Sequence, residues 1–186
     1  IPSTITDLYS IFVDLLLKNF EFRSTIDIIE TDIKHRLLAN LAKEMHVKQI
    51  VSIDKSEALS VIASYLHDRG QYNINIEELL EDIVNNNALL IYNERSELQF
   101  KHLSFQEYFT AYEFYYHRPT ERNVFVSMFH KLWWQNVAIF YAGFSKDAGG
   151  PIQNEIIKTI LSKEFITHYN DQETQKAYNA FIGFLN

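Results

Sequence analysis

One histidine, His102, stands at a junction where its side chain could bind an anion. The residues before it, LQFKH (98–102), alternate between apolar and polar positions and predict a short strand. The residues after it predict a helix, because Ser104 and Glu107 have the spacing of a capping box. The N-terminus of a helix carries free N–H groups and the positive end of the helix dipole, so negative groups bind there readily. His102 is therefore the leading candidate for a functional residue.

No residue pattern in the chain predicts catalysis or a metal site. The phosphate-loop motif G-x-x-x-x-G-K-[ST] is absent, and no serine is flanked by the glycines of a nucleophile elbow. The seven histidines contain no H-x-x-x-H or H-E-x-x-H pair, so nothing predicts a metal site on one helix. The absence of cysteine excludes disulfides, thiolate zinc sites and cysteine nucleophiles. We therefore expect no enzymatic activity and no metal in this chain.

Composition predicts a folded, acidic protein. Of the 186 residues, 47% are hydrophobic, which is enough to bury the core of one sizeable domain or two small ones. The net charge of −7 and the dispersed Lys and Arg disfavour binding to nucleic acid or to an anionic membrane surface. No apolar run is long enough to cross a bilayer, and the start IPSTITDLY has neither a signal sequence nor a methionine. We expect a cytoplasmic protein and a piece of a longer one.

The elements that must hold His102 in place are mostly helical. Apolar residues recur at helical spacing in four stretches before the predicted hairpin, and capping residues begin three of them. The predicted helices run from about residue 5 to Asn19, over 33–45, from Asp54 to Gly70 and over 76–87. The predicted caps are Thr4 with Asp7, Asp54 with Glu57, and Asn75.

Strand character is concentrated in one hairpin. ALLIY (88–92), the polar turn NERSE (93–97) and LQFKH (98–102) predict two antiparallel strands. Three helices followed by a hairpin is the order of a winged-helix unit. The next helix ends at Arg118-Pro119 and carries an aromatic stripe. We expect this stripe to pack in the core rather than to stack on nucleobases, because no Arg or Lys interleaves it; its members are Phe105, Tyr108, Phe109, Tyr112 and Tyr116.

The rest of the chain predicts further helices. They cover roughly 121–131, 133–145, 151–163 and 172–185, and their pairing is compatible with the start of a solenoid. The adjacent residues Trp133 and Trp134 must point in different directions on a helix. We expect one in the core and the other in a contact between domains.

Three segments resemble landmarks of NACHT-type signal-transduction NTPases, a family that includes NOD-like receptors and bacterial antiviral sensors. LQFKHLSFQEYFTA (98–111) resembles the segment F-x-H-x-[ST]-F-Q-E-[FY]-x-A. IPSTITDLYSIFVDLLL (1–17) is similar to the P-x-x-x-x-x-LY-x-x-[FVIL]-[VLI]-x-x-[LF]-L element that follows the ATPase core. WWQNVAIFYAGF (133–144) resembles the W-x-[ENQ]-[VI] helix with an A-G-[FL] ending, found in bacterial members. The landmarks occur in the family's order and extend over most of the chain.

The resemblance implies a mainly α architecture with three parts. Residues 1–25 would end the helical domain attached to the ATPase core, 26–118 would be the winged-helix domain with its small β-hairpin, and 119–186 would begin a C-terminal helical region. In the family, the winged-helix histidine contacts the β-phosphate of ADP and helps to hold the inactive form. His102 occupies that position of the motif.

The resemblance also implies what the chain lacks. The phosphate loop, the acidic strand that binds Mg²⁺ and the arginine sensor would all lie in the ATPase core, which is the expected partner of this chain. ADP or ATP with Mg²⁺ would bind to the full-length protein, an ATPase, and this chain alone would hold no nucleotide tightly. The implied role is a regulatory clamp that controls oligomerisation in antiviral or innate immune defence.

Two other functions fit the residues. A winged-helix regulator that binds DNA would need a basic recognition helix, but the best candidate, 54–69, offers only Lys55 and Arg69. A helical scaffold that binds another protein would leave His102 dispensable. For His102 itself, the plain alternative is an ordinary histidine at the end of a strand.

Overall fold

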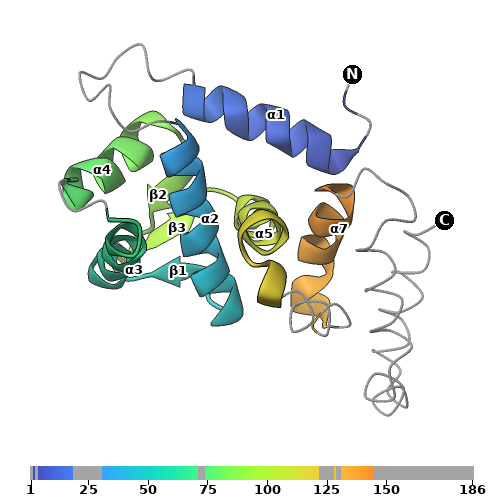
Figure 1. Ribbon diagram of the computed structural model, residues 1–186. Coiled ribbons are helices and arrows are strands. Elements are labelled where there is room, and N and C mark those ends of the chain that lie inside the picture. Colours follow the sequence, from blue (N-terminus) through green and yellow to red (C-terminus); the bar gives the residue numbers. More distant parts are fainter. Residues whose placement is uncertain are drawn as a thin grey trace.

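The computed structural model describes residues 2, 4–18, 31–70, 74–121, 128 and 131–144, which form a mainly helical fold with one small antiparallel sheet (Figure 1). The α-helices among these residues are α1 (Ile5–Lys18), α2 (Thr31–Val47), α3 (Lys55–His67), α4 (Ile76–Asn86), α5 (Leu103–Tyr112) and α7 (Gln135–Phe144). The strands are β1 (Ser52–Ile53), β2 (Leu90–Tyr92) and β3 (Leu98–Phe100). Shorter helical turns are the π-helical η1 (Glu113–His117) and the 3-10 turns η2 (Pro119–Glu121) and η3 (Leu132–Trp134).

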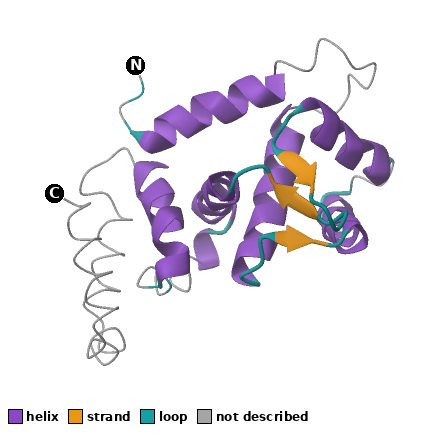
Figure 2. Cartoon of the chain, turned by 180° about the vertical axis from the view of Figure 1, so that it is seen from behind, coloured by secondary structure: helices purple, strands orange, loops and turns teal. Residues whose placement is uncertain are grey.

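The sheet contains the predicted hairpin and one additional strand. Strands β2 and β3 pair antiparallel, and β1 pairs with the other edge of β3. Along β3, Leu98 and Phe100 are buried and Gln99 between them is half-buried, which is the alternation expected of a strand with one face on the core. Helices α2, α3 and α4 lie around this sheet, and α5 follows β3 and lies beside α2 (Figures 1 and 2).

Two of the predicted helix caps are confirmed. At the start of α1, the Thr4 N–H donates to Asp7 Oδ2 (3.2 Å) and the Asp7 N–H donates to Thr4 Oγ1 (3.0 Å), which completes a reciprocal capping box. At the start of α4, Asn75 Oδ1 accepts the Glu78 N–H at 3.3 Å. Asp54 occupies the N-cap position of α3 as predicted, but its side chain makes no cap hydrogen bond.

Helix α5 lies in the centre of the helical layer, between α2 and α7 and beneath α1 (Figure 1). Its aromatic stripe packs in the core as predicted over Phe105, Tyr108 and Phe109, which are at most 4% exposed. Burial of each such ring stabilises the fold by about 1.5–3 kcal/mol. Beyond α5 the stripe reaches the surface, because Tyr116 on η1 is 51% exposed.

The predicted helix over 133–145 corresponds to η3 followed by α7. The two tryptophans differ in burial: Trp134 is buried in the core, and Trp133 is partly buried against α2. The stretches 151–163, 172–185 and nearly all of 121–131 lie outside the described residues. The domain limits at 25 and 118 stay predictions. Among the described helices, none has both the length and the apolar character needed to cross a bilayer.

Candidate functional site

His102 is the N-cap residue of α5 and lies at the surface, as the strand–helix junction predicted. Its backbone is extended (φ −135°, ψ 140°), and its carbonyl oxygen accepts the Phe105 N–H at 3.0 Å, which closes the first turn of the helix. Its side chain makes no cap hydrogen bond. The neighbours Lys101 and Leu103 are exposed as well. The histidine is therefore accessible to a partner at the start of a helix.

The capping box predicted from Ser104 and Glu107 is wrong. Because His102 takes the N-cap position, α5 begins at Leu103, and Ser104 lies inside the first turn. Glu107 faces α7 instead, where both of its carboxylate oxygens accept from Nδ2 of Asn136 at 3.0 and 3.1 Å. Burial raises the pKa of Glu107, and the hydrogen bond from Asn136 opposes that shift. Without the box, the side chain at the N-cap position leaves the first N–H groups of α5 uncapped.

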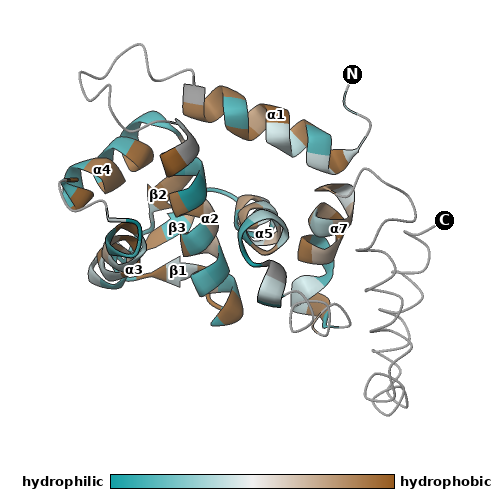
Figure 3. Ribbon diagram, in the orientation of Figure 1, coloured by the Kyte–Doolittle hydropathy of each residue, from teal (hydrophilic) through white to brown (hydrophobic). Residues whose placement is uncertain are grey.

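Helix α1 packs beside this end of α5. The Phe12 ring stacks on the Phe105 ring with centroids 5.9 Å apart, and the Phe105 ring lies 6.0 Å from the ring of His102. The outward face of α1 is apolar, and four of its side chains at helical spacing are each 49% exposed: Leu8, Ile11, Phe12 and Leu15. Figure 3 shows the hydrophobic colouring along this helix. This exposed apolar face adjoins His102 through Phe105.

The three segments that resemble family landmarks pack against one another. Segment 98–111 meets segment 133–144 through Glu107 and Asn136. Segment 1–17 meets segment 133–144 where Thr6 Oγ1 donates to the Phe140 carbonyl oxygen at 3.3 Å. Gly143 lies so close to Thr6 that a Cβ at this position would collide with the Thr6 side chain. The residues of these three segments therefore fix the packing of α1, α5 and α7, which lie side by side in Figure 1.

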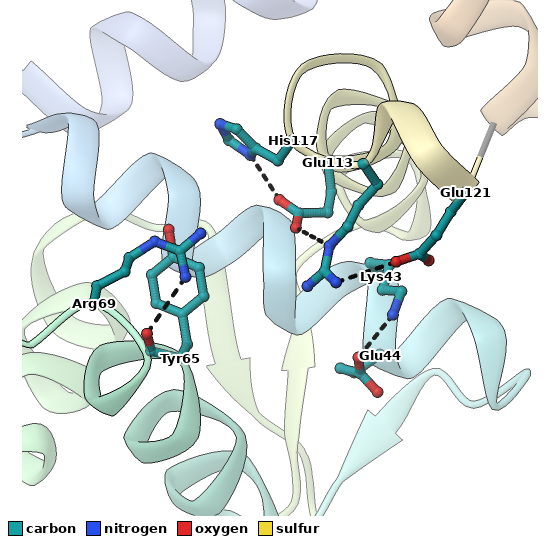
Figure 4. Close-up of polar contacts among 8 residues, drawn as sticks. Lys43, Glu44, Tyr65, Arg69, Glu113, His117 and Glu121 are labelled. Carbon is teal, nitrogen blue, oxygen red and sulfur yellow. Dashed lines mark hydrogen bonds and ion pairs between the residues drawn. The ribbon is translucent and has the colours of Figure 1, made fainter.

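An ionic cluster around the buried Glu113 follows the other end of α5 (Figure 4). The Glu113 side chain is 0% exposed; its carboxylate lies 2.7 Å from Nδ1 of His117 and accepts from Nε of Arg118 at 3.0 Å. Arg118 also donates to Glu121 at 3.2 Å. Burial by itself raises the pKa of Glu113, but the contacts with His117 and Arg118 outweigh it and hold that pKa below its usual range. We did not predict this cluster, although the i, i+4 spacing of Glu113 and His117 is a signal for it.

Within the described part of the chain, no group of three His, Asp or Glu side chains could hold a metal ion. No protein-family model matches this chain, and no curated protein or solved structure matches it. The resemblance to NACHT-type NTPases therefore stays a prediction, which rests on the residues of the three segments and on His102.

Proposed function

We propose that this chain is the regulatory winged-helix and adjoining helical part of a cytoplasmic NACHT-type signal-transduction NTPase, in which His102 contacts the β-phosphate of ADP. The observation that carries the proposal is the exposure of His102 at the start of α5, where no side chain caps the helix. A phosphate fits this place, because a helix N-terminus and a histidine both favour a negative group. The rest of the nucleotide site, with its Mg²⁺, belongs to an ATPase core that this sequence does not contain.

The order of elements supports the winged-helix assignment for 26–118. Helices α2, α3 and α4 precede the β2–β3 hairpin, and β1 adds a third strand to it. Residues 1–25 and 119–186 would then flank the winged helix as the end of one helical domain and the start of another. The exposed apolar face of α1 adjoins His102, so an ATPase core that docks there would bury both together.

The clamp acts as one arm of a two-state switch. With ADP bound, His102 ties the winged helix to the ATPase core; exchange to ATP releases the tie, and the winged helix rotates and permits oligomerisation. A charge-assisted hydrogen bond contributes about 1.5–3 kcal/mol, which is roughly 10- to 150-fold in affinity. One such bond biases the switch but cannot hold ADP alone.

Replacement of His102 by Ala in the full-length protein tests the clamp. We expect ADP retention to fall by at least about 10-fold and basal signalling to rise, because the lost bond stabilises only the closed state. The matched control is His67→Ala, which removes an exposed histidine from the end of α3. Unchanged ADP retention in the His102 variant would contradict the proposal. The isolated 186-residue chain should bind ADP with a dissociation constant no lower than millimolar, as measured by calorimetry. Micromolar binding would contradict the proposal that tight ADP binding needs the ATPase core.

A helical scaffold remains the second candidate, because α1 exposes an apolar face. Under that function, Leu8→Asp would abolish capture of a partner protein and His102→Ala would not affect it.

The DNA-binding alternative loses support, because both cations of its recognition helix are engaged. Lys55 Nζ donates to Glu81 at 2.8 Å, and the Arg69 guanidinium lies 3.7 Å from the centroid of the Tyr65 ring. Salt-dependent DNA binding by the purified chain would restore it.

A further inference from the structure

The last turn of α2 holds a histidine, His46, that is 0% exposed and packs against η3. Nε1–H of Trp133 donates to the His46 carbonyl oxygen at 2.9 Å, and Nε2 of His46 lies 3.0 Å from the Trp133 carbonyl oxygen. The Trp133 ring stacks on the His46 ring at 4.6 Å and 18°, and the Trp134 ring meets it edge-on at 4.7 Å and 85°. Two reciprocal hydrogen bonds and two ring contacts therefore join α2 to the start of α7.

This geometry fixes the tautomer of the neutral His46 ring. A carbonyl oxygen can only accept, so the ring proton must be on Nε2. In this tautomer Nδ1 is an unprotonated nitrogen, and it is buried with no hydrogen-bond partner among the described residues. A second proton on Nδ1 would place a positive charge and an unpaired N–H in an apolar pocket. Burial accordingly lowers the pKa of His46 from 6.5 to about 4, although the hydrogen bond to Trp133 opposes the shift.

Among the described residues, the carboxylates on the elements around this end of α2 are already engaged. The charged side chains on these elements are Lys43 and Glu44 on α2, Lys48 just after it, Glu57 on α3, Glu107 on α5, Glu113 on η1, and Lys131 before η3. Every acidic member of this set is engaged elsewhere: Glu44 with Lys43, Glu57 with Lys48, Glu107 with Asn136, and Glu113 with His117 and Arg118. A charged His46 would therefore have no ionic partner.

We propose that His46 and Trp133 form an acid-sensitive latch, in which protonation of His46 releases η3 from α2. Helix α7 has anchors of its own, since Asn136 bonds to Glu107 and the Phe140 carbonyl oxygen accepts from Thr6. The latch is separate from the proposed nucleotide contact, because it needs neither ADP nor His102. A pKa that falls from 6.5 to about 4 corresponds to a roughly 300-fold preference for the neutral ring in the closed latch. As the pH falls through this range, His46 is protonated more readily in the open form than in the closed form, and the latch therefore weakens.

The two tryptophans make the latch directly observable. The chain contains only Trp133 and Trp134, so its tryptophan emission reports on η3 alone. We would titrate the 186-residue chain from pH 7.5 to 3.5 and record emission together with far-ultraviolet circular dichroism. The expected result is a red shift of emission between pH 6.5 and 4 while the helical dichroism is retained, because only the indoles at η3 become exposed.

His46→Gln is the test variant, because the glutamine amide can donate to the same carbonyl oxygen and stays neutral at every pH. It should keep its pH 7.5 emission down to pH 4. His67→Gln removes an exposed histidine and should titrate like the wild type. The same red shift in His46→Gln, no shift in the wild type, or loss of dichroism in step with the shift would each overturn the latch.

Hydrogen exchange provides a second measurement if His46→Gln does not fold. In the wild-type chain, amides of 131–135 should lose protection at pH 4.5 relative to pH 7.5, after correction for the intrinsic exchange rate. Amides of α4 should keep theirs, because the hydrogen bonds and ring contacts of the latch join only α2 and η3. Equal loss in both regions would mean general unfolding and would overturn the proposal.

Discussion

The start of α5 and its body belong to one sequence motif, yet they have opposite surroundings. His102 and Leu103 are exposed, whereas every residue from Phe105 to Ala111 is buried. Two polar residues of the body find partners inside the protein: Gln106 donates to the Ile50 carbonyl oxygen at 3.0 Å, and Glu107 accepts from Asn136. A continuous motif can therefore combine one accessible functional candidate with residues that only hold the helix in place. Substitutions along α5 should separate these two roles.

Phe109→Ala should give the largest loss of stability. Phe109 is 0% exposed in the body of α5, and truncation of a buried phenylalanine to alanine costs about 3–5 kcal/mol. Denaturant unfolding followed by circular dichroism measures this loss. Tyr116→Ala, at a half-exposed position on η1, is the control and should cost less than about 1 kcal/mol. Similar losses for the two variants would mean that α5 is not the centre of the core.

Asn136→Ala should give an intermediate loss. It removes the donor to a buried carboxylate, and an unsatisfied buried group costs about 1–3 kcal/mol. The control is Asn86→Ala, whose Nδ2 donates to Asp82 on α4, away from α5, and which should cost about 0.5–1 kcal/mol. Chemical denaturation at pH 7 compares the two, and an equal or smaller loss for Asn136→Ala would argue against a tight contact of α5 with α7.

Glu107→Gln should change how stability depends on pH. Because burial raises the pKa of Glu107, the folded chain binds a proton more tightly than the unfolded chain, and the ionised carboxylate destabilises the fold as pH rises through that pKa. The glutamine cannot ionise, so the stability of the variant relative to wild type should increase between pH 4 and pH 7. Denaturation curves at several pH values measure the trend, and a difference that stays constant or falls would contradict it.

His102→Ala should have the smallest effect on the fold. The side chain is exposed and makes no cap hydrogen bond, so the free energy of unfolding should change by less than about 0.5 kcal/mol. The melting temperature should stay close to that of wild type, while ADP retention by the full-length protein falls. A loss above about 2 kcal/mol would mean that the His102 side chain stabilises the fold.

Local sequence signals predicted much of this fold. The cap at Thr4 and Asp7, the Asn75 cap and the β2–β3 hairpin follow from residues within a few positions of each other. Contacts between distant residues were not predictable in this way. His46 and Trp133 are 87 residues apart, and Glu107 and Asn136 are 29 apart, so no spacing pattern relates them. Strand β1 is two residues long and too short to show a period.

The Ser104–Glu107 pair shows why a local signal can fail. Its spacing fits a capping box, but α5 begins two residues too early for Ser104 to cap it. Packing against α7 decides the position of Glu107 instead, because the carboxylate finds Asn136 there. For His102, the sequence predicted the strand–helix junction but not the adjoining apolar face of α1, which only the tertiary fold brings close.

The contact between Thr6 and α7 determines how late α1 can pack while the chain is being translated. The hydrogen bond from Thr6 to Phe140 joins residues 134 positions apart, and α1 packs on α5 and α7, which are made late. At a translation rate of roughly 5–20 residues per second, α1 waits on the order of 10 s for the surfaces that cover its inner face. During that interval the apolar residues of α1 are open to chaperones on both faces. Among the described helices, α1 leaves the ribosome first and is therefore among the last to complete its packing.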